Sequence, residues 1–441
     1  MPRSSKPLRQ SRVPAGRIER LARFGWMSGE LALGALTEGM RRMVGATVHG
    51  GLVFSEANAE RLAKRLASLR GAAMKIGQML SLQGEDILPA ELTRALAILR
   101  ADANTMPPAQ LHRALKRAYG SGWEALFRRF DETPVAAASI GQVHRALTAD
   151  GRDVALKVQY PGIARSIDAD VENVAAVLRL ARLLPGDFDP AALLAEVKRQ
   201  LRRETDYKIE AGLQNRYAVL VAGDPQLLVP AVHDELTTTR ILAMDFLDGT
   251  PLEELCEDGA AQTLRDHLGL LLYRLMLREL FEFHFLQSDP NFANYVYLPA
   301  TEQLGLLDFG GSRDVPIELS AQYRRLLGAA AANDRTTVRQ ALCDIGFART
   351  QGDSERADAL AELFLIGCEP FRHRGAYDFG ASDIPARARE LGLQLAAKGL
   401  LRPPPPATVF LHRKLAGMFL LCARMRARVD VRTLLRVADA A

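Results

Sequence analysis

The chain has 441 residues, of which 48% are hydrophobic and 25% charged, a composition typical of a globular protein large enough for more than one domain. No uncharged apolar run approaches the roughly 18 residues that a membrane-spanning helix needs, and the polar, basic N-terminus does not predict a secretory signal. The cysteines are scattered without Cys-x-x-Cys spacing, which argues against a disulfide framework or zinc site and fits a reducing compartment: Cys256, Cys343, Cys368 and Cys422.

Positive charge is concentrated at the N-terminus. Residues 1–70 hold thirteen Lys or Arg against five Glu, a balance of +8, so the rest of the chain stands at −3 for a total of +5. Such asymmetry favours an anionic partner surface, either lipid headgroups or nucleic acid. Nucleic acid is the weaker choice, because aromatic residues make up only 6% and do not interleave with the basic ones. We expect residues 1–16 to be a disordered basic arm.

Residues 17–129 are predicted to form a helical N-terminal extension. Its first helix, residues 17–44, has Gly25 and Gly29 four apart, so it is expected either to lie on a bilayer or to dock on another helix of the protein. A long helix over residues 55–82 follows and contains Lys75-Ile76-Gly77-Gln78 near its end. Shorter helices are expected over residues 89–99 and 109–119.

The strand-rich part begins near Phe130. An alanine-rich stretch, Ala136-Ala137-Ala138-Ser139, precedes a hairpin turn at Asp150-Gly151. The next strand, Val154-Ala155-Leu156-Lys157-Val158, alternates apolar side chains with Lys157. In kinases a loop between the first strands covers the phosphates and the third strand offers a lysine to them. The pattern predicts this role for Lys157; the alternative is an exposed strand lysine.

Lysine is scarce in this chain, with nine residues against 48 arginines. A lysine that is retained in such a background suggests a need for a compact ammonium group. Lys75 and Lys157 fall in the motifs just described. We expect the other seven lysines at ordinary surface positions.

A kinase also needs a helix-borne glutamate paired with the strand lysine. Helices are predicted over residues 167–184 and 190–212, and the second contains two candidates, Glu204 and Glu210. The alternative for both is a charged helix face, because basic residues surround them. The residues alone leave the choice open.

Two further strands are predicted over residues 227–233 and 239–246. The second ends in Met244-Asp245-Phe246-Leu247-Asp248-Gly249, where a kinase hinge would cross between lobes and bind adenine through its backbone. A helix over residues 263–285 follows. The chain after Gly311 is expected to be largely helical, with breaks at residues 375–383 and 403–406 before a last helix over residues 409–428.

Two short motifs near residue 300 carry the chemistry. Asp289 is followed five residues later by Asn294, and fourteen residues beyond comes Asp308-Phe309-Gly310 after a short strand, Leu304 to Leu307. In kinase-like folds the first Asp orients the attacking hydroxyl, while the Asn and the second Asp hold Mg²⁺ on the phosphates. Neither motif is specific alone, but the pair at this spacing predicts a site for ATP or ADP with Mg²⁺.

With these motifs assembled, the chain resembles the UbiB/AarF family of atypical kinase-like proteins, most closely the coenzyme Q biosynthesis branch. The resemblance covers residues 17–313 well and the C-terminal helices loosely. It implies an α+β fold, a bilobal protein-kinase-like architecture with a small lobe over residues 130–248 and a largely helical large lobe over residues 249–441. It also implies ATP binding and weak ATP hydrolysis in support of ubiquinone synthesis, without convincing protein-kinase activity.

By position, the resemblance implies that Lys157 contacts the α- and β-phosphates and that Glu210 is its ion-pair partner. Asp289 takes the place of the catalytic aspartate, and Asn294 and Asp308 bind Mg²⁺. The occluding motif implied by the family is Lys75, Gly77 and Gln78, folded over the active site with Glu204 and Asp206 to restrict protein substrates. Alanines 136–138 and Ser139 are placed over the phosphates, where alanine lacks the freedom of glycine to adopt φ > 0.

Two departures from the family pattern stand out. Gln287 lies two residues before Asp289, where family members often have His, so the catalytic loop is expected to be held differently. The C-terminal membrane spans of some bacterial relatives are not seen in this sequence, so we expect a cytoplasmic protein that associates peripherally with membranes. Expected partners are membrane lipids or quinone-pathway intermediates and ubiquinone biosynthesis enzymes, and a homodimer is compatible with the sequence.

Two other functions fit the same motifs. A small-molecule phosphotransferase of the aminoglycoside or choline type also carries Asp-x-x-x-x-Asn followed by Asp, but does not call for Lys75, Gly77 and Gln78. A nucleotide-gated scaffold for biosynthetic enzymes would keep the site without catalysing a reaction. The leading hypothesis is an ATP-dependent enzyme, an ATPase or a small-molecule or lipid kinase.

Overall fold

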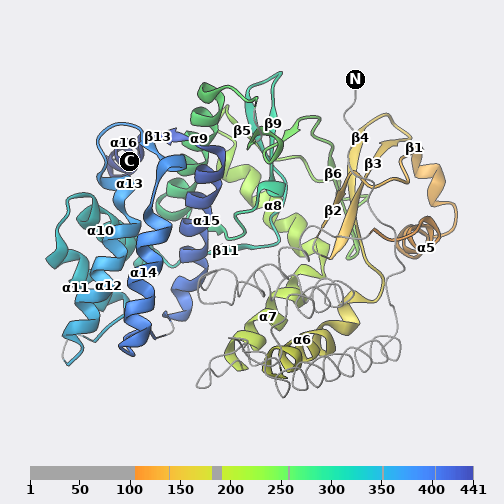
Figure 1. Ribbon diagram of the computed structural model, residues 1–441. Coiled ribbons are helices and arrows are strands. Elements are labelled where there is room, and N and C mark those ends of the chain that lie inside the picture. The colour runs from red at the N-terminus through yellow and green to blue at the C-terminus, as the bar shows by residue number, and fades with distance from the viewer. Residues whose placement is uncertain are drawn as a thin grey trace, which may run out of the picture. The chain divides into compact units, whose positions relative to one another are not determined.

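The computed structural model describes residues 105–138, 140–180, 191–256, 259–349, 352–402 and 404–440. The described residues divide into two compact units, shown in Figure 1. One unit contains those between 105 and 212 together with 231–246, and the other contains 213–230 together with those from 247 onward. The division at residues 246/247 lies close to the expected lobe boundary, whereas residues 213–230, which we placed in the small lobe, belong to the second unit.

The first unit is built on an antiparallel sheet. Strands β1, β3, β4 and β6 neighbour one another in that order, and the short β2 pairs with β3. The hairpin predicted at Asp150-Gly151 joins β3 to β4, and Gly151 has a φ of 94°, which favours glycine. The strands are β1 (Phe127–Phe130), β2 (Ala136–Ala137), β3 (Gly141–Thr148), β4 (Asp153–Gln159) and β6 (Ile241–Asp245).

Helices complete the first unit. Helix α5 (Pro108–Tyr119) buries Leu111 and Leu115 in one hydrophobic core with the apolar face of β4. Helices α6 (Ile163–Leu180), α7 (Ala191–Glu204) and α8 (Tyr207–Val221) follow, and α8 continues into the second unit. The single helix expected over residues 190–212 is therefore wrong: it is two helices, because the Thr205 hydroxyl bonds to the Arg202 carbonyl and Asp206 caps the start of α8.

The second unit holds a sheet beside the buried helix α9 (Gln262–Phe281). The sheet order is β5-β10-β9-β7, with β5 (Leu227–Leu228), β7 (Thr250–Pro251), β9 (Tyr295–Leu298) and β10 (Gln303–Leu306). The strand expected over residues 227–233 is thus reduced to β5, and β5 pairs with β10 rather than with the small-lobe strands. The helix expected to reach residue 285 ends at Phe281, and strand β8 (Phe285–Gln287) follows and pairs with β11 (Ser312–Asp314).

The chain beyond β11 is largely helical, as predicted. The predicted last helix ends at Met425 rather than at residue 428, and a further helix, α16, follows it. None of the described helices is long and apolar enough to cross a membrane. The elements are α10 (Ile317–Ala331), α11 (Arg335–Ile345), α12 (Ser354–Gly367), α13 (Glu369–Arg372), β12 (Tyr377–Asp378), α14 (Ile384–Ala397), α15 (Val409–Met425), β13 (Arg428–Val429) and α16 (Val431–Ala440).

His412 in α15 gives the helical part of the second unit a pH-dependent stability. The Tyr323 hydroxyl lies 2.6 Å from its Nε2, and its ring stacks on Phe347 at an interplanar angle of 7°. Burial lowers the pKa of His412 from 6.5 to about 4. Between those values the unfolded chain binds a proton that the folded chain does not, so this stability is present above pH 6.5 and is lost as the pH falls through the window.

We therefore expect urea unfolding of the native chain to show lower stability near pH 5 than near pH 7, and His412→Gln to flatten that dependence. The stability difference between pH 7 and pH 5 that His412→Gln removes should be roughly 2 kcal/mol, less than the full linkage value because His412 is only half-buried. An unchanged pH dependence in His412→Gln would assign the slope to other groups.

Candidate functional site

Lys157 is held in the first unit by a buried ion pair. It lies on β4 between Leu156 and Val158, and its Nζ is 2.6 Å from Oε1 of Glu210 in the first turn of α8. The two side chains are only 7% and 3% exposed, so their charges are desolvated and act on each other strongly. The structure thus gives Lys157 the partner implied by the resemblance, Glu210, where the residues alone left two candidates.

The Glu-x-Asp motif lies at the break between α7 and α8. Glu204 is the last residue of α7 and is buried, while Asp206 Oδ1 accepts a hydrogen bond from the Lys208 backbone N–H at 3.0 Å. This break starts α8 at the position that brings Glu210 to Lys157. Lys75, Gly77 and Gln78 lie outside the described residues, so an occluding role for the motif stays a prediction.

The alanine-rich stretch forms the small strand β2 and a tight turn. Ala136 pairs with Val143 and Ala137 with Gln142, and the Ala138 N–H donates to the Gly141 carbonyl at 2.9 Å. Ser139 lies outside the described residues. A Cβ on Gly141 would lie 2.5 Å from the Val158 carbonyl oxygen, so only glycine allows this turn to approach β4 so closely.

The predicted hinge begins within the last residues of β6. Met244 is buried opposite Ala155, and the Phe246 N–H donates to the Asp153 carbonyl at 3.0 Å. The Arg145 guanidinium carbon lies 4.1 Å from the centroid of the Phe246 ring. These contacts order the end of β6, and a nucleotide contact by Met244 or Phe246 stays a prediction.

The predicted catalytic loop, in the second unit, is organised by Gln287. The Gln287 side chain accepts from the Asp289 N–H at 3.1 Å and donates to the carbonyls of Asp289 and Asp308, at 3.2 and 3.1 Å. One amide therefore joins the two loops that carry the predicted acidic residues. Whether these bonds hold the loop differently from the His of other family members stays a prediction.

Asn294 and Asp308 lie together at one end of the second sheet. The Leu307 N–H donates to the Asn294 carbonyl at 3.0 Å, and both side chains line one small cavity of about 10 Å³. Asn294 Nδ2 donates to the Asp289 carbonyl at 2.8 Å, and Asp308 Oδ1 accepts from the Gly310 N–H at 3.0 Å. The Asn294 amide is thereby oriented, with its oxygen as the remaining acceptor.

This donor set fits Mg²⁺ bound together with a nucleotide. Mg²⁺ is usually held by one or two protein oxygens, waters and substrate phosphates rather than by a complete protein cage. The described part of the chain contains no group of three or more His, Cys, Asp or Glu residues arranged to hold a metal. Asn294 and Asp308 are the residues that would hold the ion.

Three charged residues at this site were not predicted from the sequence. Arg413 of α15 forms an ion pair with Asp289, and Lys414 lies 2.7 Å from Glu279 of α9, with both side chains at most 1% exposed. The expectation that all lysines apart from Lys75 and Lys157 are surface residues is therefore wrong for Lys414. The available signal was a charged pair, Arg413-Lys414, in a helix whose other residues are apolar except for His412 and Arg424.

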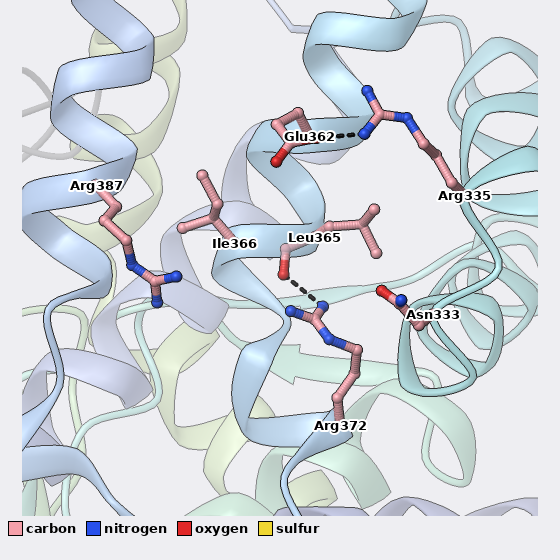
Figure 2. A pocket seen from close by; sticks show the side chains of 7 residues that line it. All are labelled: Asn333, Arg335, Glu362, Leu365, Ile366, Arg372 and Arg387. Carbon is pink, nitrogen blue, oxygen red and sulfur yellow. Dashed lines mark hydrogen bonds and ion pairs between the residues drawn. The ribbon is translucent and has the colours of Figure 1, made fainter.

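A second pocket, of about 250 Å³, lies among the C-terminal helices of the same unit (Figure 2). Its arginines are already engaged: Arg335 pairs with Glu362, Arg372 donates to the Leu365 carbonyl at 2.5 Å, and Arg387 pairs with Glu369. It contains none of the predicted site residues. Its lining is Asn333, Arg335, Glu362, Leu365, Ile366, Arg372 and Arg387.

A strand lysine paired with a helix glutamate in one unit, and Asp, Asn and Asp on two linked loops in the other, define a kinase-like protein. Residues 98–342 match the model of the ABC1 atypical kinase-like domain. The chain belongs to this family, which confirms the UbiB/AarF resemblance and the α+β, bilobal kinase-like fold.

Relatives and solved structures agree with this assignment. The chain is 42% identical over 437 residues to the atypical kinase COQ8B, mitochondrial, of Rattus norvegicus, covering 98% of this chain and 82% of the relative. It is 36% identical over 427 residues to the atypical kinase COQ8, mitochondrial, of Saccharomyces cerevisiae, with 96% and 84% covered. The Rv3197–erythromycin complex from Mycobacterium tuberculosis superposes with a TM-score of 0.59 at 25% identity, covering 86% of this chain and 95% of that one.

Proposed function

We propose that this protein binds ATP with Mg²⁺ and hydrolyses it, or transfers its phosphoryl group to a small molecule or lipid, in support of ubiquinone biosynthesis at a membrane surface. The observation that carries the proposal is the buried Lys157–Glu210 ion pair. A desolvated pair of this kind is a poor way to gain stability. It is, however, what a kinase uses to fix the ammonium group that contacts the phosphates.

Each residue has a distinct task in this proposal. Glu210 orients Lys157, and Lys157 neutralises the α- and β-phosphates. Asp289 accepts the proton of the attacking hydroxyl or water. Asn294 and Asp308 hold the metal, whose charge stabilises the phosphoryl oxygens during transfer.

The pathway and the location rest on relatives and on charge. Relatives named COQ8 are mitochondrial atypical kinases, and the resemblance to the coenzyme Q branch of the family supports a role in ubiquinone synthesis here. The basic N-terminal residues, with a balance of +8 over residues 1–70, support peripheral attachment to anionic lipid on the cytoplasmic side. The acceptor proposed is a quinone-pathway intermediate, another lipid or water.

ATP turnover by the purified full chain tests the proposal, with Mg²⁺ or with excess chelator, and with vesicles of phosphatidylcholine alone or mixed with phosphatidylglycerol. We expect turnover that requires Mg²⁺ and rises with the anionic vesicles. Binding of Mg-nucleotide, seen as a raised melting temperature, without turnover under any condition would favour the nucleotide-gated scaffold. Absence of both binding and turnover would contradict the kinase-like site.

A further inference from the structure

Helix α15 packs its backbone directly on the catalytic loop. A Cβ on Gly417 would lie 2.0 Å from Cγ and 2.6 Å from Cβ of Pro290, the residue that follows Asp289. No side chain fits at this position, so the approach of helix to loop depends on glycine. Arg413 stands one helical turn before Gly417, on the same face, and its Nη2 donates to Oδ1 of Asp289.

The same helix is also fixed to the residues before Asp289. Lys414 Nζ lies 2.7 Å from Oε2 of Glu279 on α9, and Oε1 of Glu279 accepts the Gln287 backbone N–H at 3.0 Å. Helices α9 and α15 lie side by side within this unit. The loop is thus held from α15 on both sides of Asp289, through Gln287 and through Pro290.

The Arg413 guanidinium is an unusual group to bury for stability alone. The residue is 6% exposed, and its Nε and Nη1 find no hydrogen-bond partner in the described part of the chain. Buried donors left without acceptors destabilise a fold, and one buried ion pair does not reliably offset this. What the arrangement does provide is a fixed cation at one oxygen of Asp289, and the Asp289 side chain remains 19% exposed.

We propose that Arg413 is a positioning residue for phosphoryl transfer, holding Oδ1 of Asp289 so that Oδ2 is the oxygen presented to the acceptor. This deepens the proposed function and rests on it. As the acceptor oxygen bonds to the γ-phosphorus and the bond to the leaving ADP breaks, the acceptor proton passes to Oδ2. Arg413 keeps the carboxylate in the orientation that receives this proton. Helix α15 thereby contributes a positioning residue to the site.

A double-mutant cycle tests this inference, because a positioning residue acts only through the residue it positions. We expect Asp289→Asn to lower kcat about 100-fold, and Arg413→Met to lower it roughly 10- to 100-fold. The KM for MgATP should stay within about threefold of the native value, since Lys157 and Asp308 are intact. For the same reason, the rise in melting temperature on adding Mg-nucleotide should stay close to that of the native chain. The double variant should be no slower than Asp289→Asn alone, within about threefold.

Arg413→Lys provides the conservative variant and covers the case in which Arg413→Met does not fold. A lysine keeps the charge but not the guanidinium fork, so kcat should lie between those of the native chain and Asp289→Asn. Arg325→Met is the matched control, because Arg325 pairs with Asp344, at 2.8 Å, on another pair of helices. It should keep native turnover.

The inference would be overturned if the kcat losses of the two single variants multiplied in the double variant. It would also be overturned if folded Arg413→Met or Arg413→Lys kept the native kcat. Either outcome would leave the proposed function in place. A native chain without turnover would overturn the proposed function, and the inference with it.

Discussion

Asp308→Asn is expected to lower Mg²⁺-dependent ATP turnover by roughly 10³-fold, which corresponds to about 4 kcal/mol of transition-state stabilisation. The substitution removes the negative charge that Asp308 would offer to the metal and keeps almost the same side-chain shape. Asp308 Oδ1 accepts the Gly310 N–H at 3.0 Å, and an amide oxygen can accept the same bond. The turn after β10 should therefore persist, and the melting temperature without nucleotide should stay close to native.

Asp314→Asn is the matched control for this variant. Asp314 follows six residues later, on β11, and its 75% exposed carboxylate pairs with Arg216. Exposed pairs of this kind contribute at most about 1 kcal/mol to stability, so turnover should remain within about twofold. Native turnover in Asp308→Asn would contradict the role of Asp308 as a metal ligand and count against kinase chemistry at this position.

The parts of the site that the sequence predicted are those set by local pattern. Lys157 follows a hairpin turn and alternates with buried apolar residues, and period-two alternation is a property of a single strand. The Asp308-Phe309-Gly310 turn follows a short apolar strand, which the structure shows as β10. In both cases the neighbours in sequence are sufficient to fix the local geometry.

The partner of Lys157 could not be chosen in the same way. Glu204 and Glu210 lie six residues apart in a stretch with continuous helical character, and the deciding feature is the break between α7 and α8. That break depends on side-chain bonds of Thr205 and Asp206 to nearby backbone groups. Such bonds compete closely with the helix, so composition alone does not reveal them.

The contact of α15 with Asp289 could not be predicted from the sequence for a different reason. Arg413 meets a residue 124 positions earlier in the chain, and no local pattern encodes a contact of that separation. Charged side chains in a helix are normally assigned to its solvent face, so the burial of Arg413 and Lys414 goes against the usual expectation. Prediction from local sequence pattern therefore fails at the site itself, and functional sites are where residues most often depart from such patterns.

Glu279 and Lys414 form the buried centre beneath the catalytic loop. Besides Lys414, Glu279 binds the Tyr217 hydroxyl, whose oxygen lies 2.7 Å from Oε1, and the Gln287 N–H. Burial and the Glu279 charge raise the pKa of Tyr217, so the hydroxyl stays protonated and donates. The carboxylate thus has two neutral donors and one counter-charge, all in the interior.

Lys414→Met is expected to lower the free energy of unfolding by about 3–5 kcal/mol, because it leaves the Glu279 charge buried without its counter-charge. The midpoint of thermal unfolding should fall by on the order of 10 °C. Adding Glu279→Gln should recover most of the loss. The charge is then gone, and the amide oxygen at position 279 can still accept from Tyr217 and Gln287.

The exposed Arg325–Asp344 pair sets the scale for comparison, since Arg325→Met should cost less than about 1 kcal/mol. If Lys414→Met cost no more than this, the Glu279–Lys414 pair would not be energetically important. If instead the double variant were as unstable as Lys414→Met, packing of the lysine stem rather than its charge would be the stabilising feature. Recovery in the double variant, with turnover still reduced, would show that the pair stabilises the loop by charge and that its geometry also serves Asp289.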